Sequence, residues 1–158
     1  MSSAPDRRGN GRARGAPSKD VFQKRFILAG DERDAADAQR ALLRALEEHG
    51  FEPASRFAIR LALEEALINA FKHGNRNDPA KRVTLDCRVG REAVVIDISD
   101  EGEGFDLDAV PDPTEEENLQ IPSGRGIMLM RSFMSEVDFH PPGNRVRMVY
   151  RRPGAATG

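Results

Sequence analysis

Apolar residues along this chain follow two distinct periods, which predict an alternation of strands and helices. Runs with apolar side chains at every second position are typical of half-buried strands, and runs with spacings of three and four residues are typical of amphipathic helices. We expect three helices, over residues 31–48, from residue 54 or 55 to residue 73, and over residues 124–135. We expect five strands, over residues 21–28, 82–89, 93–99, 137–140 and 145–151. Gly50 and Gly74 act as stop signals for the first two helices.

The order of these elements indicates an α+β fold rather than a doubly wound α/β sheet. Two adjacent helices are followed by a hairpin turning at Gly90 and Arg91, then a helix, then a hairpin turning at 141–144. We therefore expect a two-layer α/β sandwich, in which helices cover one face of a mixed, mostly antiparallel sheet.

Length and composition predict one soluble domain. The chain has 158 residues, of which 32% are charged and 39% hydrophobic, and this balance is typical of a globular protein. We expect a basic, disordered arm over 1–20, a folded domain over 21–152 and a flexible tail over 153–158. The arm is interpreted as solubilising, so no direct contact with nucleic acid is expected. With no signal peptide and no membrane-spanning run, the predicted location is the cytoplasm.

A polar stripe on the second helix carries the first candidate chemistry. Helical spacing places Glu65, Asn69 and Lys72 on one side of this helix, whereas Glu64 falls nearer Arg60 as an i,i+4 pair. A plain solvent-facing strip would explain this pattern. Alternatively, Asn69 offers an oxygen ligand to Mg²⁺, Lys72 a phosphate contact, and Glu65 a general base for a hydroxyl or water.

Two glycine turns supply further candidate binding groups. A strand runs into Asp100-Glu101-Gly102-Glu103-Gly104, where an acid at a strand end can accept a hydrogen bond from an exocyclic amine such as that of adenine. Ser123-Gly124-Arg125-Gly126 opens the third helix, and its exposed N–H groups suit phosphates. Between the turns, residues 106–122 contain six acids, no bases and three prolines, which predict a long surface loop. Each turn alone would be an ordinary connection.

The order and spacing of all three motifs resemble the N, G1 and G2 boxes of the Bergerat ATP-binding fold, over about 22–151. Within that superfamily the chain is similar to the small anti-sigma-factor serine-protein kinases, through residues 63–70, 72–74, 124–130 and 133–137. The resemblance implies ATP and Mg²⁺ as cofactors, with the general base at Glu65, the metal ligand at Asn69 and the adenine contact at Asp100. The residues expected to shape or line the pocket are Gly102, Gly104, Gly124, Gly126, Lys72, His73, Ser123 and Arg125.

This likeness leads to two function hypotheses. The first is a serine/threonine protein kinase of a bacterial partner-switching system, which phosphorylates a STAS-type antagonist, binds a sigma factor and so regulates transcription. The second is a regulatory partner that binds ATP without chemistry. Pro122 stands where some members of the family carry a basic residue, and it leaves this choice open. A sensor histidine kinase fragment is a weaker third interpretation. The resemblance also suggests a homodimer.

Overall fold

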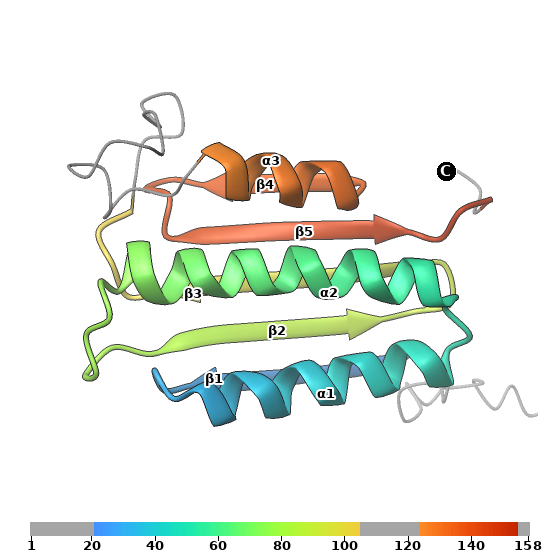
Figure 1. Cartoon of the computed structure of the whole chain (residues 1–158), viewed down its shortest axis with the longest axis horizontal. Coiled ribbons are helices and arrows are strands. Elements are labelled where there is room, and N and C mark those ends of the chain that lie inside the picture. Colours follow the sequence, from blue (N-terminus) through green and yellow to red (C-terminus); the bar gives the residue numbers. More distant parts are fainter. Residues whose placement is uncertain (1–20, 105–123, 155–158) are drawn as a thin grey trace, which may run out of the picture.

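The computed structural model describes residues 21–104 and 124–154 (Figure 1). Residues 1–20, 105–123 and 155–158 lie outside the described part. They include the predicted basic arm and the predicted acidic loop 106–122. The elements in chain order are β1 (Phe22–Leu28), α1 (Glu32–Glu48), α2 (Pro53–Ile68), the π-helical turn η1 (Asn69–Gly74), β2 (Val83–Val89), β3 (Ala93–Asp100), α3 (Gly124–Phe133), β4 (Glu136–His140) and β5 (Arg145–Arg151).

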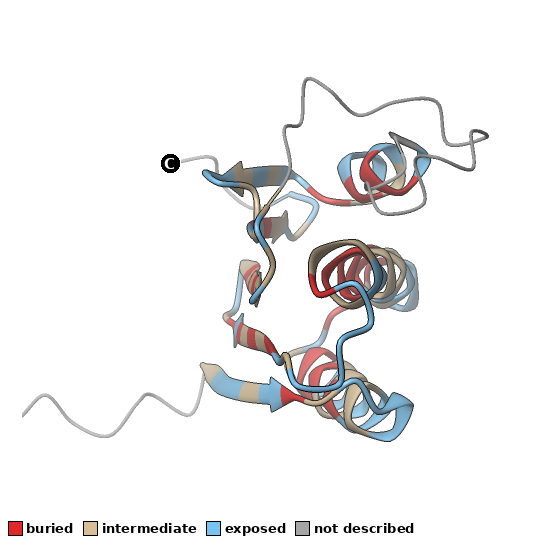
Figure 2. Ribbon diagram, turned by 90° about the vertical axis from the view of Figure 1, so that its left-hand side faces the viewer, coloured by how far each residue is buried: buried red, intermediate tan, exposed pale blue. Residues whose placement is uncertain are grey.

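Five strands form one sheet in the order β1-β2-β3-β5-β4, and every neighbouring pair is antiparallel. Figure 2 shows all three α-helices on the same side of this sheet. The prediction of a two-layer α+β sandwich with helices on one face is therefore confirmed. Strand β5 inserts between β3 and β4, so the C-terminal hairpin places its turn beside the end of β3.

The core lies between the two layers. On β2 and β3 every second residue is buried, which is the pattern of strands with one face against helices. Cys87 is one of these positions and is 1% exposed. Burial raises the pKa of its thiol to about 12, so this cysteine is an inert core residue, as its place in an alternating strand predicts. The largest fully buried side chains include Phe51, Leu42, Leu46, Ile59, Leu63, Leu85, Ile96 and Met148.

Local signals fix the helix boundaries. The Asp31 side chain accepts a hydrogen bond from the Arg33 N–H at 2.8 Å and caps α1. Gly50, at φ +74°, ends it in the left-handed conformation that glycine favours. Pro53 occupies the first turn of α2, where a missing N–H costs nothing. The predicted continuous helix to position 73 is α-helical only to Ile68, after which η1 takes over.

The sheet face away from the helices is polar and crossed by ion pairs. Arg25 bonds Asp86 at 2.7 Å across β1 and β2, and Arg147 bonds Asp97 at 3.0 Å across β5 and β3. Asp86 and Asp97 are themselves cross-strand partners, so the two arginines offset a like-charge pair. This face therefore needs no covering layer of helices.

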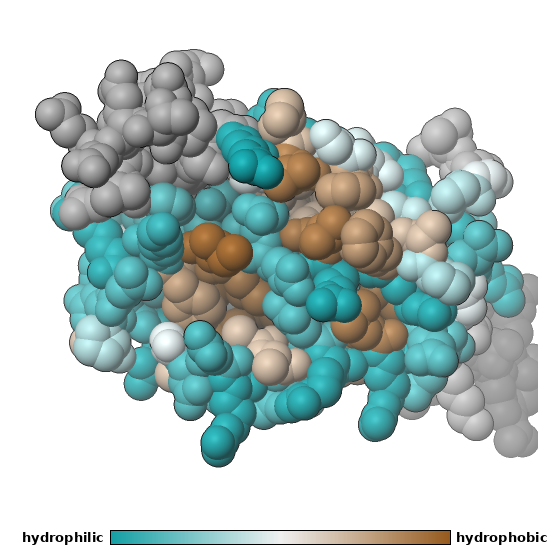
Figure 3. All heavy atoms as spheres, viewed as in Figure 1, coloured by the Kyte–Doolittle hydropathy of each residue, from teal (hydrophilic) through white to brown (hydrophobic). Residues whose placement is uncertain are grey.

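The helix side of the molecule shows apolar patches among polar side chains (Figure 3). The large apolar side chains most exposed on the helices are Phe57 and Ile68 on α2 and Met128 on α3. None of the helices in the described ranges combines the length and apolar character needed to span a membrane.

Candidate functional site

Asn69 lies where α2 changes its helical form. The Asn75 N–H donates to the carbonyl of Ala70 at 2.8 Å, a five-residue step that defines the wider π-helical turn. Such turns inside or at the end of α-helices occur frequently at functional sites. Asn69 is 9% exposed, and its side-chain nitrogen is buried without a hydrogen-bond partner among the described residues. A buried, unsatisfied amide of this kind is a reason to look for a ligand next to it.

Asp100 closes β3 and begins the first glycine turn. Its Oδ1 accepts the Gly102 N–H at 2.8 Å, so the carboxyl group is folded back over its own turn. A Cβ at Gly74 would overlap this carboxyl group, and a Cβ at Gly102 would overlap the Gly74 carbonyl. The glycines are therefore required because two backbone segments and a carboxyl group meet at van der Waals distance.

The turn between β4 and β5 supports the same segment from the other side. The Asp100 N–H donates to the Asn144 carbonyl at 2.9 Å. Gly104 has φ +86°, and a Cβ there would overlap the Pro142 carbonyl. Thus Asp100 is held between η1 and the C-terminal hairpin, two segments that are far from it and from each other in sequence.

A small cavity joins the end of α2, the end of β3 and this hairpin. It is lined by Ala66, Asn69, Ala70, Gly74, Ile98, Asp100, Met130, Phe139, Gly143, Asn144, Arg145 and Val146. Its free volume of about 20 Å³ has room for roughly one water molecule, so a purine base can enter only if lining groups move outward. Apolar residues and glycines make up most of the lining, and the polar members are Asn69, Asp100, Asn144 and Arg145, which is the composition of a small-molecule site. These residues fit a bound nucleotide chemically.

Burial also changes the acidity of the site. It raises the pKa of Asp100 from the ordinary 3.8 to about 6, although the Gly102 N–H and the nearby Lys81 charge oppose this shift. A carboxyl group with a pKa in this range ionises close to neutral pH and is sensitive to any polar group placed against it.

The structure separates the two neighbouring acids of α2, as their helical spacing predicts. Glu64 accepts a hydrogen bond from Arg60 at 3.2 Å on the surface. Glu65 is partly buried, and within the described ranges it makes no hydrogen bond or ion pair. Glu65 does not line the Asp100 cavity, so its role as a base depends on a substrate that reaches it from outside.

Lys72 does not line the Asp100 cavity with Asn69. It lines a different groove, between the start of α1 and the end of α2, together with Glu64, Ile68 and Phe71. The prediction assumed α-helical spacing beyond Ile68, but the π-helical turn holds more residues per turn and rotates Lys72 away. Its neighbour His73 is partly buried.

The second glycine turn opens α3, as predicted. The helix begins at Gly124, Gly126 is buried, and Arg125 is exposed. Ser123 and Pro122 lie outside the described residues. Met130, one helical turn beyond Gly126, reaches the Asp100 cavity and connects this helix start with the rest of the site.

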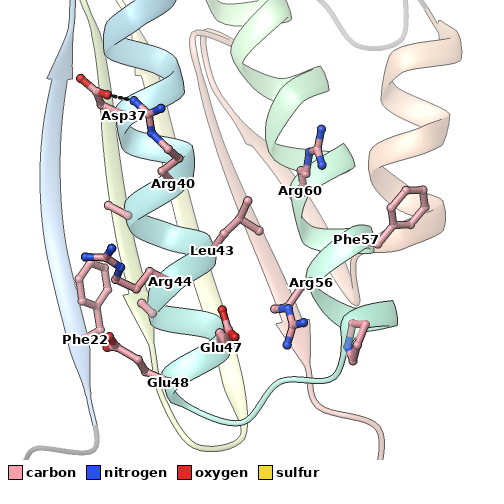
Figure 4. Close-up of a pocket in the computed structure, with 13 residues that line it drawn as sticks. Phe22, Asp37, Arg40, Leu43, Arg44, Glu47, Glu48, Arg56, Phe57 and Arg60 are labelled. Carbon is pink, nitrogen blue, oxygen red and sulfur yellow. Dashed lines mark hydrogen bonds and ion pairs between the residues drawn. The ribbon is translucent and has the colours of Figure 1, made fainter.

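A wider groove of about 830 Å³ lies between α1 and the first half of α2 (Figure 4). Arg44 and Arg56 are on its two facing helices, with Leu43 and Phe57 beside them. Phe57 is twelve residues before Asn69, roughly 18 Å along the helix axis. None of the predicted nucleotide-binding residues that the structure describes lines this groove, so it is separate from the Asp100 site.

The sequence patterns did not identify two asparagines that contact the site. Asn75 follows Gly74 directly, and Asn144 appeared only as a turn residue. Both contact the Asp100 turn, Asn75 through Glu101 at a sequence separation of 26 and Asn144 through Asp100 at a separation of more than 40. In the sequence each asparagine directly follows a glycine, and this pattern indicates a turn but not a contact with the Asp100 segment.

The fold and this site define a nucleotide-binding α+β sandwich. The model of the histidine kinase-like ATPase domain matches residues 28–150, and the chain belongs to this family. Membership implies that the chain binds ATP. The match covers β2, β3, both glycine turns and the full length of each described helix, and so includes all described site residues.

Curated relatives add a more specific likeness over part of the chain. The anti-sigma F factor of Oceanobacillus iheyensis is 32% identical over 83 residues, 51% of this chain and 56% of that protein. That of Geobacillus stearothermophilus is 33% identical over 95 residues, 58% and 64% of the two chains. That of Clostridium perfringens is 29% identical over 90 residues, 55% and 64%. In each case the match spans less than two thirds of the relative.

Proposed function

We propose that this protein is an ATP-dependent serine/threonine kinase of the anti-sigma-factor type, which phosphorylates a STAS-type antagonist in bacterial partner switching. The observation that carries the nucleotide site is the buried, unsatisfied Asn69 amide in one cavity with the Asp100 carboxyl group. The relatives named anti-sigma F factor support the choice of partners, a sigma factor and its antagonist. Such a kinase would act in the cytoplasm, and the family likeness favours a homodimer.

In this proposal Asp100 accepts a hydrogen bond from the exocyclic amine of adenine, and Gly102 and Gly104 keep the turn open to the base. The side-chain oxygen of Asn69 would hold Mg²⁺, which supplies charge neutralisation on the phosphates when bound. The N–H groups at the start of α3, between Gly124 and Gly126, would face the phosphates, because a helix start favours anions. Ser123, Arg125, Lys72 and His73 remain predicted contacts.

Glu65 would act on the substrate rather than on the nucleotide. Its partly buried carboxylate has no ion pair with any of the described residues, and it lies one helical turn before Asn69. It would orient the antagonist hydroxyl and accept its proton as that oxygen attacks the γ-phosphoryl group, while the bond to the β,γ-bridging oxygen breaks.

Transfer from γ-labelled ATP to STAS-domain proteins encoded beside this chain tests the proposal. We expect labelled antagonist with the wild-type protein and no label with Glu65→Gln, while both proteins bind ATP. ATP binding without transfer to any of these proteins would favour the alternative of a non-catalytic, nucleotide-dependent regulator. Absence of ATP binding would overturn both versions.

A further inference from the structure

Asn75 is the most deeply buried polar side chain among the described residues, at 1% exposed. Both polar atoms of its amide are used inside the protein. Its Nδ2 donates to the Arg82 carbonyl at 3.0 Å, and its Oδ1 accepts the Glu101 N–H at 2.8 Å. The side chain thereby ties the end of η1 to two other segments.

The contact with Glu101 matters because this N–H belongs to the peptide unit that follows Asp100. The peptide unit before Asp100 is also fixed, since the Asp100 N–H donates to the Asn144 carbonyl at 2.9 Å. With both flanking peptide units held, the Cα–Cβ direction of Asp100 is set by the backbone. The carboxyl group then leans against Gly74, the residue directly before Asn75.

A third hydrogen bond closes the arrangement. The Glu101 side chain accepts the Arg82 N–H at 3.0 Å, so Arg82, Asn75 and Glu101 are connected in a ring of hydrogen bonds. Only a side chain with one donor and one acceptor at this spacing satisfies both a carbonyl and an N–H group. An apolar residue would remove the side-chain partner of both the Arg82 carbonyl and the Glu101 N–H.

We propose that Asn75 is a positioning residue for base recognition, which aims the Asp100 carboxyl group at the exocyclic amine of adenine without touching the nucleotide. This inference rests on the proposed nucleotide site. It makes the selectivity for adenine a property of two residues that are 25 positions apart: the acid contacts the base, and the asparagine sets its direction. The loss of Asn75 then weakens recognition of the amine more than it weakens binding of the rest of the nucleotide.

Calorimetric titration with ATP and with purine riboside triphosphate, which lacks the exocyclic amine, tests this inference. The wild type is expected to prefer ATP, and Asn75→Ala to reduce this preference about three- to tenfold, as expected for one hydrogen bond made imperfect. In an Asp100→Ala background, Asn75→Ala should change the preference no further. Asn75→Asp keeps an acceptor for the Glu101 N–H, and it should retain more of the preference than Asn75→Ala.

Ser55→Ala is the matched control. Ser55 is also a buried polar residue, and it bonds the Tyr150 hydroxyl at 2.6 Å at the other end of α2. Its loss should lower stability and leave the preference unchanged. If Asn75→Ala does not fold, Asn75→Ser replaces it with the same expectation, because serine is too short to reach Glu101.

Each outcome separates this inference from the proposed function. An equal loss of affinity for both nucleotides in Asn75→Ala, or an unchanged preference, would overturn the positioning role while the ATP site stands. Wild-type protein that binds both nucleotides equally would overturn it as well, because Asp100 would then not recognise the amine. Wild-type protein that binds neither nucleotide would overturn the proposed function itself.

Discussion

The carboxyl group of Asp100 packs against Gly74 so closely that a Cβ at position 74 would overlap it. Gly74→Ala should therefore push the Asp100 carboxyl group out of the cavity, against the hydrogen bond from the Gly102 N–H that holds it, and reduce ATP affinity at least about tenfold. Calorimetric titration measures this loss. Gly30→Ala is the control, because a Cβ there meets no atom within 4 Å. Equal ATP affinity in the two variants would contradict the close packing described for Asp100.

The raised pKa of Asp100 predicts how nucleotide binding depends on pH. Burial raises this pKa to about 6, and the ionised carboxylate is the stronger acceptor for the adenine amine. If binding requires ionisation, ATP affinity should be about tenfold weaker at pH 5 than at pH 7. Asp100→Asn binds more weakly and should lose this pH dependence. Comparing the two proteins at each pH removes the contribution from protonation of ATP itself. A wild-type profile parallel to that of Asp100→Asn would contradict the prediction.

The raised pKa of Asp100 also predicts how folding stability depends on pH. A carboxyl group that holds its proton more tightly in the folded state favours the protonated form there. Its contribution to stability is therefore largest below pH 3.8 and decreases as pH rises through about 6. Urea unfolding of the nucleotide-free protein should show Asp100→Asn gaining stability relative to wild type as pH is raised from 4 to 7. A constant difference between the two proteins over this range would refute the raised pKa.

Two adjacent acids on α2 offer an internal comparison. Glu64 is paired with Arg60 on the surface, whereas Glu65 has no hydrogen bond or ion pair within the described ranges. Glu65→Gln should abolish phosphoryl transfer to the antagonist with ATP affinity within about twofold of wild type. Glu64→Gln loses only a surface pair worth about 0.3–0.5 kcal/mol, so its transfer rate should remain near that of wild type. Equal rates in the two variants would remove Glu65 from its proposed role.

The sequence predicted the layers and the two glycine turns because these depend on local signals. Alternation along β2 and β3 and the stop at Gly50 are set by residues a few positions apart. The contacts that hold Asp100 come instead from Asn75 and the 142–144 turn. No spacing rule connects those positions, because only the insertion of β5 beside β3 brings the hairpin to this place.

Helical spacing was reliable on α2 and misleading after it. It separated Glu64 from Glu65, a distinction that the Arg60–Glu64 pair bears out. It cannot give the angle between Asn69 and Lys72, since the periodicity assumed an α-helix and η1 has a wider turn. The sequence has no proline or other helix-breaking residue within 69–73, so the change to a π-helical turn could not be predicted from it.

Arg152 gives a stability prediction that is independent of the site. Its guanidinium donates to the His49 carbonyl at 2.6 Å and the Gly50 carbonyl at 3.1 Å, and stacks 4.1 Å above the Phe51 ring. It thereby connects the end of the sheet to the C-terminus of α1, where cations are favoured.

Arg152→Ala removes two charge-assisted hydrogen bonds and a cation–π contact, so it should lower the free energy of unfolding by about 2 kcal/mol. Urea denaturation measures this change. Arg151→Ala removes only the surface pair with Glu136 and should cost less than about 1 kcal/mol. Because Arg152 lies at the opposite end of α2 from Asn69, ATP affinity at 25 °C should stay within about twofold in both variants. A large loss of ATP affinity in Arg152→Ala would show that the two ends of α2 are energetically coupled.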